Sequence, residues 1–316
     1  MNVEAVLGLW QDRPSSEALT TAAHADQIGF RRLWIGEMAT YDAFALATRI
    51  ATATPRIEPV VGPLAVNIRS PVAIAMGVAS VHDLTGRTTH VALGTSSPTV
   101  VERWHGRSRK GSTEALATTA TSVRILLAGR RDPATGFRLR TPPVPAEITI
   151  AGFGPRAVVH AAAHTGRLLL NMVTPEAVAT FRAKLDAIDG ARTHLSAWLI
   201  GAVDPTPEDI AQIRSAVVGY LGAPGYGEMF SAAGFAEVVR LARSGAHPRE
   251  VLEAIPDGFE RSVGLVGAKS EISQILERYR EAGLDTACVV PVTGSGDAGR
   301  RVLETVFELS AANEAD

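Results

Sequence analysis

The feature that most constrains this chain is a regular alternation of short hydrophobic runs with helical segments. Each run is continuously apolar, as expected of strands that are buried on both faces of a parallel sheet. The helical segments that follow often open with proline or a small polar residue. Eight strands are predicted in this way, at residues 3–9, 32–36, 57–66, 89–93, 148–151, 168–172, 195–203 and 286–291.

This alternation predicts an α/β fold, and eight strand–helix units are what a closed (β/α)8 TIM barrel needs. A doubly wound open sheet is the alternative, because alternation alone does not show that a sheet closes. The 316 residues suit one large barrel and no linker divides them, so we expect a single domain over residues 1–316. Insertions follow strands four and seven. Residues 129–145 are expected to form a small hairpin, and residues 207–282 to form three or four helices without a strand.

Composition limits the kinds of partner. The formal net charge is -2 and the basic residues look scattered along the chain, so neither nucleic acid nor an anionic membrane is an expected partner. No signal peptide and no apolar run long enough to span a bilayer is found, which predicts a cytoplasmic protein. The lone cysteine, Cys288, lies in an apolar run and is expected to be a buried, inert thiol.

Polar and small residues gather where the predicted strands end. In a barrel these positions share one face, which carries the chemistry. A carboxylate, hydroxyls, an amide and a glycine turn around an apolar mouth suit a large flat cofactor better than a hydrolytic site, which would need paired acids or a nucleophile with its base. The strand-end residues are Trp10, Glu37, Met38, Leu64, Ala65, Val66, Asn67, Gly94, Thr95, Ser96, Gly152, Phe153, Gly154, Pro155, Arg156, Asn171 and Met172.

The turn after the fifth strand, Gly152-Phe153-Gly154-Pro155-Arg156, runs from a strand into a helix that begins with proline. Two glycines allow a ligand to approach the backbone, and the free N–H groups of a first helical turn attract an anion. Arg156 adds a positive charge. A plain strand-to-helix turn is the alternative, because a lone Gly-x-Gly is weak support for a binding site.

Other candidates have ordinary explanations as well. His160 and His164 stand four apart on one helix, but no third ligand accompanies them, so no metal site is expected. An acid in the position of Glu37 often caps a helix or forms an ion pair. The Gly94-Thr95-Ser96 turn suits a plain turn equally well.

These residues together resemble the luciferase-like flavin and deazaflavin oxidoreductases, a family of (β/α)8 barrels. The resemblance covers nearly the whole chain in the right order and is weakest at residues 204–260. The matching segments are residues 29–30 with 33–37, 42–57, 62 with 69–71, 84–87, 92–96, 152–157, 170–176, and 265–267 with the helix of residues 272–283.

Within that family the chain is most similar to the branch that uses the 5-deazaflavin coenzyme F420, and FMN is the alternative cofactor. The resemblance implies a ring across the barrel mouth, supported by a non-proline cis peptide that the motif alignment places at Leu64–Ala65. It implies that the Gly94–Ser96 turn meets the ring or its side chain, and that Gly154 to Arg156 hold the phosphate. Glu37 falls where the family carries an acid near the ring, and Asn171 is also expected at the cofactor.

Two departures from the family pattern matter. Some deazaflavin members follow the acid with a histidine that transfers a proton, whereas this chain has Met38. The usual phosphate site of barrels follows strands seven and eight, whereas the one expected here follows strand five.

The expected activity is hydride transfer between F420 and a small organic substrate. The alternatives are an FMN-dependent monooxygenase of the same family and a barrel that binds flavin without turnover. The substrate pocket is expected to involve Trp10, Met38, Tyr41 and Tyr226, the last in a glycine-rich insertion, residues 222–235, that could act as a lid. The resemblance also implies a homodimer.

Overall fold

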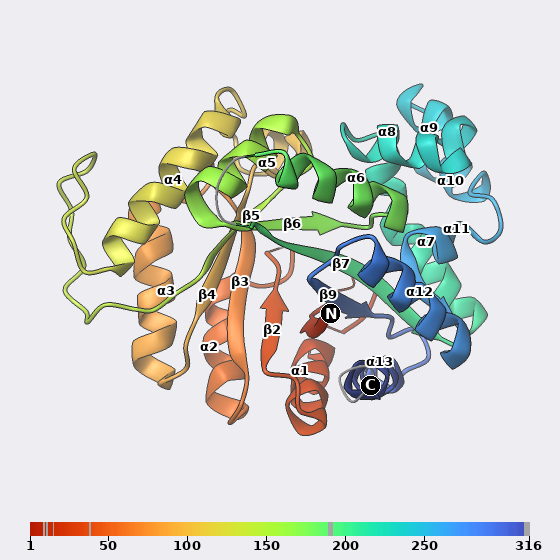
Figure 1. The fold of residues 1–316 in the computed structure, drawn as a ribbon, viewed down its shortest axis with the longest axis horizontal. Coiled ribbons are helices and arrows are strands. Elements are labelled where there is room, and N and C mark those ends of the chain that lie inside the picture. The colour runs from red at the N-terminus through yellow and green to blue at the C-terminus, as the bar shows by residue number, and fades with distance from the viewer. Residues whose placement is uncertain (9, 11, 15, 38, 189–191, 313–316) are drawn as a thin grey trace.

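A computed structural model describes residues 1–8, 10, 12–14, 16–37, 39–188 and 192–312. Its strands pair only in parallel, and a pairing between β6 and β7 closes eight of them into a barrel in the order β1, β2, β3, β4, β5, β6, β7, β9 (Figure 1). The (β/α)8 prediction is therefore confirmed, and the open sheet is wrong. The barrel strands are β1 (Asn2–Val6), β2 (Arg32–Ile35), β3 (Glu58–Ala65), β4 (His90–Gly94), β5 (Ile148–Ala151), β6 (Arg167–Asn171), β7 (His194–Val203) and β9 (Thr286–Pro291).

Helices connect the strands around the outside of the barrel (Figure 1). Side-chain oxygens of Asp42, Ser70 and Thr174 cap the helices that follow β2, β3 and β6, and Pro71 and Pro175 occupy first positions. No described helix combines the length and apolarity that crossing a bilayer requires. The outer helices are α1 (Glu17–Ile28), α2 (Ala43–Ala53), α3 (Pro71–Thr85), α4 (Ser112–Leu127), α5 (Pro155–His160), α6 (Pro175–Asp186), α12 (Lys269–Glu281) and α13 (Arg300–Ala312), with π-helical turns η1 (Thr99–Trp104) and η2 (Ala161–Thr165).

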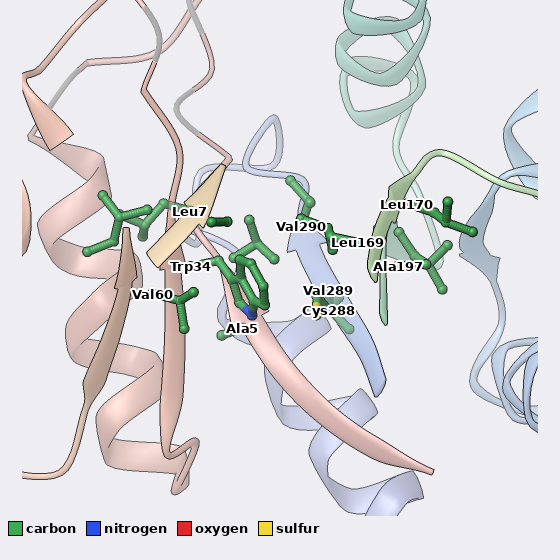
Figure 2. Packing of buried hydrophobic residues seen from close by; sticks show 14 of the residues in the cluster. Ala5, Leu7, Trp34, Val60, Leu169, Leu170, Ala197, Cys288, Val289 and Val290 are labelled. Carbon is green, nitrogen blue, oxygen red and sulfur yellow. The ribbon is translucent and has the colours of Figure 1, made fainter. Parts of the chain in front are cut away.

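The interior of the barrel is filled by apolar side chains from neighbouring strands. Figure 2 shows Trp34, Val60, Leu169 and Cys288 among them. The rings of Trp34 and Trp198 meet edge to face, 6.0 Å apart. Cys288 is fully buried, as predicted, and burial raises the pKa of its thiol well above the ordinary value. A packed interior leaves the carboxyl ends of the strands as the place for a site.

The end of β3 differs from the expectation. Four residues of β3, from Val61 to Leu64, face three of β4, from Val91 to Leu93, and this bulge lies beside the predicted cofactor residues. The cis peptide is Gly62–Pro63, so the placement at Leu64–Ala65 is wrong. Proline explains the shift, because its tertiary amide has a much weaker trans preference than an ordinary peptide.

The insertions also differ in detail. Residues 207–282 include a strand that the sequence analysis missed, β8 (Gly264–Gly267), which pairs with the second half of β7. Four apolar residues are too short a run to separate a strand from a helix. The hairpin expected at 129–145 is an irregular excursion instead, without strand residues, closed by the Asp132 N–H bond to the Phe137 carbonyl. The other helices of the long insertion are α7 (Pro207–Leu221), α8 (Tyr226–Phe230), η3 (Ser231–Phe235), α9 (Ala236–Arg243), α10 (Pro248–Glu253) and α11 (Phe259–Ser262).

Candidate active site

The closed parallel barrel brings the ends of β2, β3, β4, β5 and β6 to one rim, and most of the predicted site residues lie there. Backbone bonds continue past the strands and fix this rim: Val66 N–H bonds to the Gly94 carbonyl (3.1 Å), and Gly152 N–H to the Leu169 carbonyl (3.2 Å). Met38 lies outside the described residues. Tyr41 is half-buried against the core.

Glu37 is held in an ion pair that the sequence analysis did not foresee. Arg69, just after β3, donates from its Nε to Glu37 Oε2 (3.0 Å). Its Nη2 donates to both Glu37 Oε1 and Asp42 Oδ2. The hydrogen bond to Glu37 is the largest influence on Arg69, and it raises the pKa of that guanidinium. Glu37 also accepts a long bond (3.4 Å) from Ala43 N–H at the start of α2. A carboxylate is thus fixed on the rim by a cation.

Asp42 completes this cluster. It caps α2 by accepting from the Phe44 and Ala45 N–H groups, both at 3.0 Å. Burial alone would raise the pKa of its carboxyl, but hydrogen bonds from Arg69 and the backbone lower it below the ordinary value. In the sequence, Arg69 stood out only as part of the Arg-Ser-Pro segment at 69–71. That segment indicated the family and a helix start, but not the ion pair with Glu37.

Asn67 and Thr95 anchor the loop that follows β4. Asn67 donates from its side-chain amide to the Ser108 carbonyl (2.5 Å), and Arg109 donates to Thr95 Oγ1 (3.4 Å). Two buried polar atoms, Asn67 Oδ1 and Arg109 Nε, have no partner among the described residues. Because buried polar groups nearly always have partners, these two atoms indicate where a ligand can bind. Ser96, which follows Thr95, has a positive φ of 54°.

The turn after β5 is open to solvent. Gly154 has φ -67° and ψ 149°, and a Cβ placed there would meet nothing within 4 Å. Neither backbone conformation nor protein packing therefore requires glycine at this position. Arg156 forms a 2.6 Å ion pair with Glu114 of α4, in which both side chains are largely exposed, at 72% and 63%. The guanidinium could exchange this weak surface partner for a phosphate.

The long insertion touches the rim through Tyr226. Its hydroxyl accepts a hydrogen bond from the Asn171 amide (3.0 Å). The centroid of its ring lies 4.4 Å from that of the Phe153 ring and 4.9 Å from that of the Tyr220 ring. Gly225, at φ 86°, allows this approach, because a Cβ there would lie 2.8 Å from Phe153 Cβ. Burial raises the pKa of both tyrosine hydroxyls. The predicted substrate-pocket residue Tyr226 and the predicted cofactor residue Asn171 are thus in direct contact.

Trp10 is positioned by the end of β9. Its indole N–H bonds to the Pro291 carbonyl (3.0 Å) at the end of β9. It borders a cavity of about 20 Å³ that Arg13, Glu17, Thr40 and Thr293 also line. That volume holds about one water molecule. The cavity is therefore too small for a cofactor.

The arrangement favours holding and orienting a ligand over acid–base hydrolysis. Within the described part of the chain no group of three metal-ligating side chains is found, and the rings of His160 and His164, 5.7 Å apart, have no third ligand beside them. Glu37 is a carboxylate fixed after β2, and the rim adds an orphaned amide oxygen after β3 and an open glycine turn with a guanidinium after β5. These features fit a flat molecule with an anionic side chain.

The chain is similar to several known proteins over most of its length. A protein of Mycobacterium tuberculosis, provisionally named a coenzyme F420-dependent oxidoreductase, is 25% identical and covers 93% of this chain and 95% of its own. The coenzyme F420-dependent tetrahydromethanopterin reductase of Methanopyrus kandleri has a TM-score of 0.74 at 15% identity over 99% of both chains. The FMN complex of the oxygenating constituent of 3,6-diketocamphane monooxygenase from Pseudomonas putida has a TM-score of 0.69 at 14% identity, over 99% of this chain and 98% of that one.

The two structural likenesses show a shared fold, and they include both an F420 enzyme and an FMN enzyme. The family itself is shown by sequence, because the profile of the luciferase-like monooxygenases matches residues 5–286, most of the chain. The chain therefore belongs to the luciferase-like monooxygenase family, whose members are oxidoreductases.

Proposed function

We propose that this oxidoreductase transfers a hydride between coenzyme F420 and a small organic substrate. The observation that carries the proposal is the rim itself: an open glycine turn beside Arg156, an orphaned amide oxygen on Asn67, and Glu37 held by Arg69. The relative provisionally named as F420-dependent supports F420 over FMN.

Each part of the rim has a role in this proposal. Gly154 leaves room for a phosphate at the helix start, and Arg156 can donate to it. Asn67 offers a buried acceptor to an N–H of the ring. Glu37, fixed by Arg69, can hold or accept a proton beside the ring or the substrate. Phe153 and Tyr226 cover the side of the mouth near β5 and β6 and exclude water there.

The bound cofactor supplies the redox chemistry, because carbon in place of nitrogen at the reactive ring position of a deazaflavin favours hydride transfer over oxygen activation. The protein supplies position and charge. The residue that follows Glu37 is a methionine, so the histidine that serves some deazaflavin enzymes is absent from the sequence there. Any proton transfer at this place therefore depends on Glu37 or on the substrate.

Cofactor titration tests the proposal. Purified protein titrated with F420 and with FMN, followed by fluorescence, should bind F420 at least about tenfold more tightly, a difference of about 1.4 kcal/mol. Equal affinity or tighter FMN binding would favour the monooxygenase alternative, which the likeness to the FMN complex keeps open. Tight F420 binding without turnover of any alcohol, ketone or enone tested would favour the non-catalytic alternative.

We also propose that the protein is a homodimer. Met76 and Leu84, both on α3, are large apolar side chains that are 49% and 72% exposed. Exposed apolar side chains on one helix support burial against a second copy. Light scattering on the purified protein should give twice the chain mass of 33.3 kDa, and a monomer at micromolar concentration would contradict the proposal.

A further inference from the structure

The loop after β4 carries a concentration of positive charge that no part of the proposed function uses. Residues 103–110, here called the basic segment, have the sequence Arg-Trp-His-Gly-Arg-Ser-Arg-Lys and contain no acid. The chain as a whole has a net charge of -2, so this density is local. The ion pairs on this side of the rim involve Arg69 and Arg156, and none within the described residues involves the cations of the basic segment.

The basic segment is tied to the rim rather than free in solvent. Asn67, at the end of β3, bonds to the Ser108 carbonyl, and Arg109 bonds to Thr95, at the end of β4. Arg109 Nε is buried and has no partner among the described residues. The segment leads directly into α4, whose Glu114 pairs with Arg156. The basic segment therefore runs from the ends of β3 and β4, beside the proposed ring site, to the start of α4, beside the proposed phosphate site.

The other side chains of the basic segment face solvent. Arg103, Arg107 and Lys110 are exposed, and Trp104 is 52% exposed. Cations without anionic partners at the edge of a cleft create a positive potential that attracts anionic ligands. A guanidinium binds carboxylates through two parallel hydrogen bonds. Such a surface suits a flexible chain with several carboxylates.

We infer that the basic segment binds the carboxylates that follow the phosphate in the side chain of the coenzyme. Arg109 would bind the carboxylate nearest the phosphate, and Arg107 and Lys110 would bind those that extend over the rim. This inference rests on the proposed use of F420. The proposed ligand of the basic segment is the polyanionic coenzyme bound at the barrel mouth. A nucleic acid is disfavoured, because the segment is short and the net charge of the chain is negative.

The test compares two ligands and two double variants. The ligands are F420 and a truncated coenzyme that keeps the ring, the sugar-alcohol chain and the phosphate but lacks the carboxylates. The test variant is Arg107→Ala/Lys110→Ala, and the matched control is Arg138→Ala/Arg140→Ala, in the excursion at the opposite end of α4 (Figure 1). All four side chains are exposed, and both variants remove two positive charges. Dissociation constants are measured by fluorescence at low and high salt, with circular dichroism to confirm folding.

The test variant should bind F420 roughly three- to tenfold more weakly and the truncated coenzyme about as tightly as the unmodified protein. The control should change neither constant. Added salt should weaken F420 binding more in the unmodified protein than in the test variant, since screening removes an attraction that the variant lacks.

Three results would overturn the inference while leaving the cofactor assignment intact: unchanged F420 binding by the test variant, equal weakening of both ligands, or equal weakening by the control. Binding of duplex DNA or anionic vesicles that the test variant alone loses, with F420 unaffected, would assign the segment to a macromolecule. Failure of F420 to bind the unmodified protein would instead contradict the proposed function, and the inference with it.

Discussion

At the scale of single residues, the charge that the site can offer to a ligand depends on which ion-pair partner each charged side chain has. Glu37 and Asp42 share Arg69, while Arg156 pairs with Glu114 at the surface. The first cluster is fixed by several hydrogen bonds. The second is a single exposed pair, and such pairs typically contribute between about 0 and 1 kcal/mol. The Glu37 cluster is therefore a fixed element of the site, whereas Arg156 is available to a ligand.

Glu37→Gln should lower kcat by roughly 10²-fold while F420 affinity stays within about threefold, because the amide keeps the size of the side chain but cannot take up a proton. The measurement is steady-state kinetics once a substrate is found, with a parallel fluorescence titration. Asp42→Asn is the control, since it removes the other carboxylate on Arg69 and keeps a good helix cap. If both variants lose kcat equally, Glu37 acts only by positioning Arg69.

Arg156→Ala should weaken F420 binding by roughly 10- to 100-fold, the value of a charge-assisted hydrogen bond, and leave a phosphate-free ring fragment unaffected. Glu114→Ala breaks the same ion pair but keeps the guanidinium. It should leave F420 binding unchanged or tighter. Equal losses for intact coenzyme and fragment in Arg156→Ala would show that the turn is only a helix start.

Gly154→Val tests the same turn without changing charge. The backbone at φ -67° and ψ 149° accepts valine, and the space around the new Cβ is empty, so the midpoint of urea unfolding should not fall. F420 binding should nevertheless weaken by at least about tenfold, because the side chain would occupy the place of the phosphate. Normal affinity in a folded variant would remove this turn from the site.

At the scale of elements, the long insertion and the barrel meet through a few defined contacts. Tyr226, at the start of α8, bonds to Asn171 of β6, and its ring packs on Phe153 after β5. A second tyrosine, Tyr279 of α12, donates to the Val173 carbonyl after β6. The first hydrogen bond joins the insertion to the rim, and the second joins an outer helix to the barrel wall.

Tyr226→Phe should speed amide hydrogen exchange in residues 222–235, because the hydroxyl bonded to Asn171 is lost while the ring contacts remain. A hydrogen bond of this kind contributes about 1 kcal/mol, so the local opening equilibrium should shift by about fivefold. Tyr279→Phe removes a buried hydroxyl elsewhere and should lower the free energy of global unfolding without this local effect. Unaltered exchange in Tyr226→Phe would show that the aromatic packing alone holds the insertion.

At the scale of the whole molecule, the amino end of the barrel is closed by ionisable residues from successive strands. Arg32 forms an ion pair with Glu147 (2.7 Å), and Glu147 N–H bonds to His90 Nδ1 (3.1 Å). Glu58 lies 3.6 Å from the other ring nitrogen of His90. Burial, and next the charge of Arg32, lower the pKa of His90 to about 4, although Glu147 and Glu58 oppose this. The folded barrel therefore favours the neutral imidazole.

This coupling predicts a pH dependence of stability. The unfolded chain protonates His90 near its ordinary pKa of about 6.5, above the folded value, so the unfolded state binds more protons between these values. Stability from this group is complete above about pH 6.5 and is lost as pH falls toward 4, by about 3 kcal/mol. Urea unfolding between pH 7 and 4.5 should show this loss, and His90→Asn should reduce it.

Exposed His105→Asn is the control and should leave the pH dependence unchanged. Burial raises the pKa of the Glu4 carboxyl, so the contribution of Glu4 to stability grows as pH falls, opposite to that of His90. Glu4 is present in the unmodified protein and in both variants. The difference between His90→Asn and the unmodified protein therefore reports on the histidine together with its effect on Glu58 and Glu147, whose carboxyl pKa values burial raises but neighbouring charges, His90 among them, lower below the ordinary value. Parallel pH curves for the two would exclude His90 as the source.

The sequence by itself determined the alternation of strands and helices, whereas closure into a barrel depends on the β6–β7 pairing, which alternation alone does not fix. Continuous apolar runs define strands buried on both faces, and the caps and prolines, such as Ser70 with Pro71, set the helix starts, since both are local properties of the chain. The family motifs also predicted a (β/α)8 barrel. The short β8 was missed because four residues give no period, and its pairing with β7 is a tertiary contact.

Only the tertiary structure decided the partners within the site. The pairing of Glu37 with Arg69, of Asn171 with Tyr226, and of Asn67 with Ser108 joins residues 32 to 55 positions apart. Barrel closure decides these pairs, because it brings the ends of neighbouring strands and their loops to one rim. The spacing of these residues along the sequence does not indicate that they are in contact. Local patterns therefore sufficed to predict where the rim is, and the folded chain was needed to show which of its charges are already paired and which remain available for a ligand.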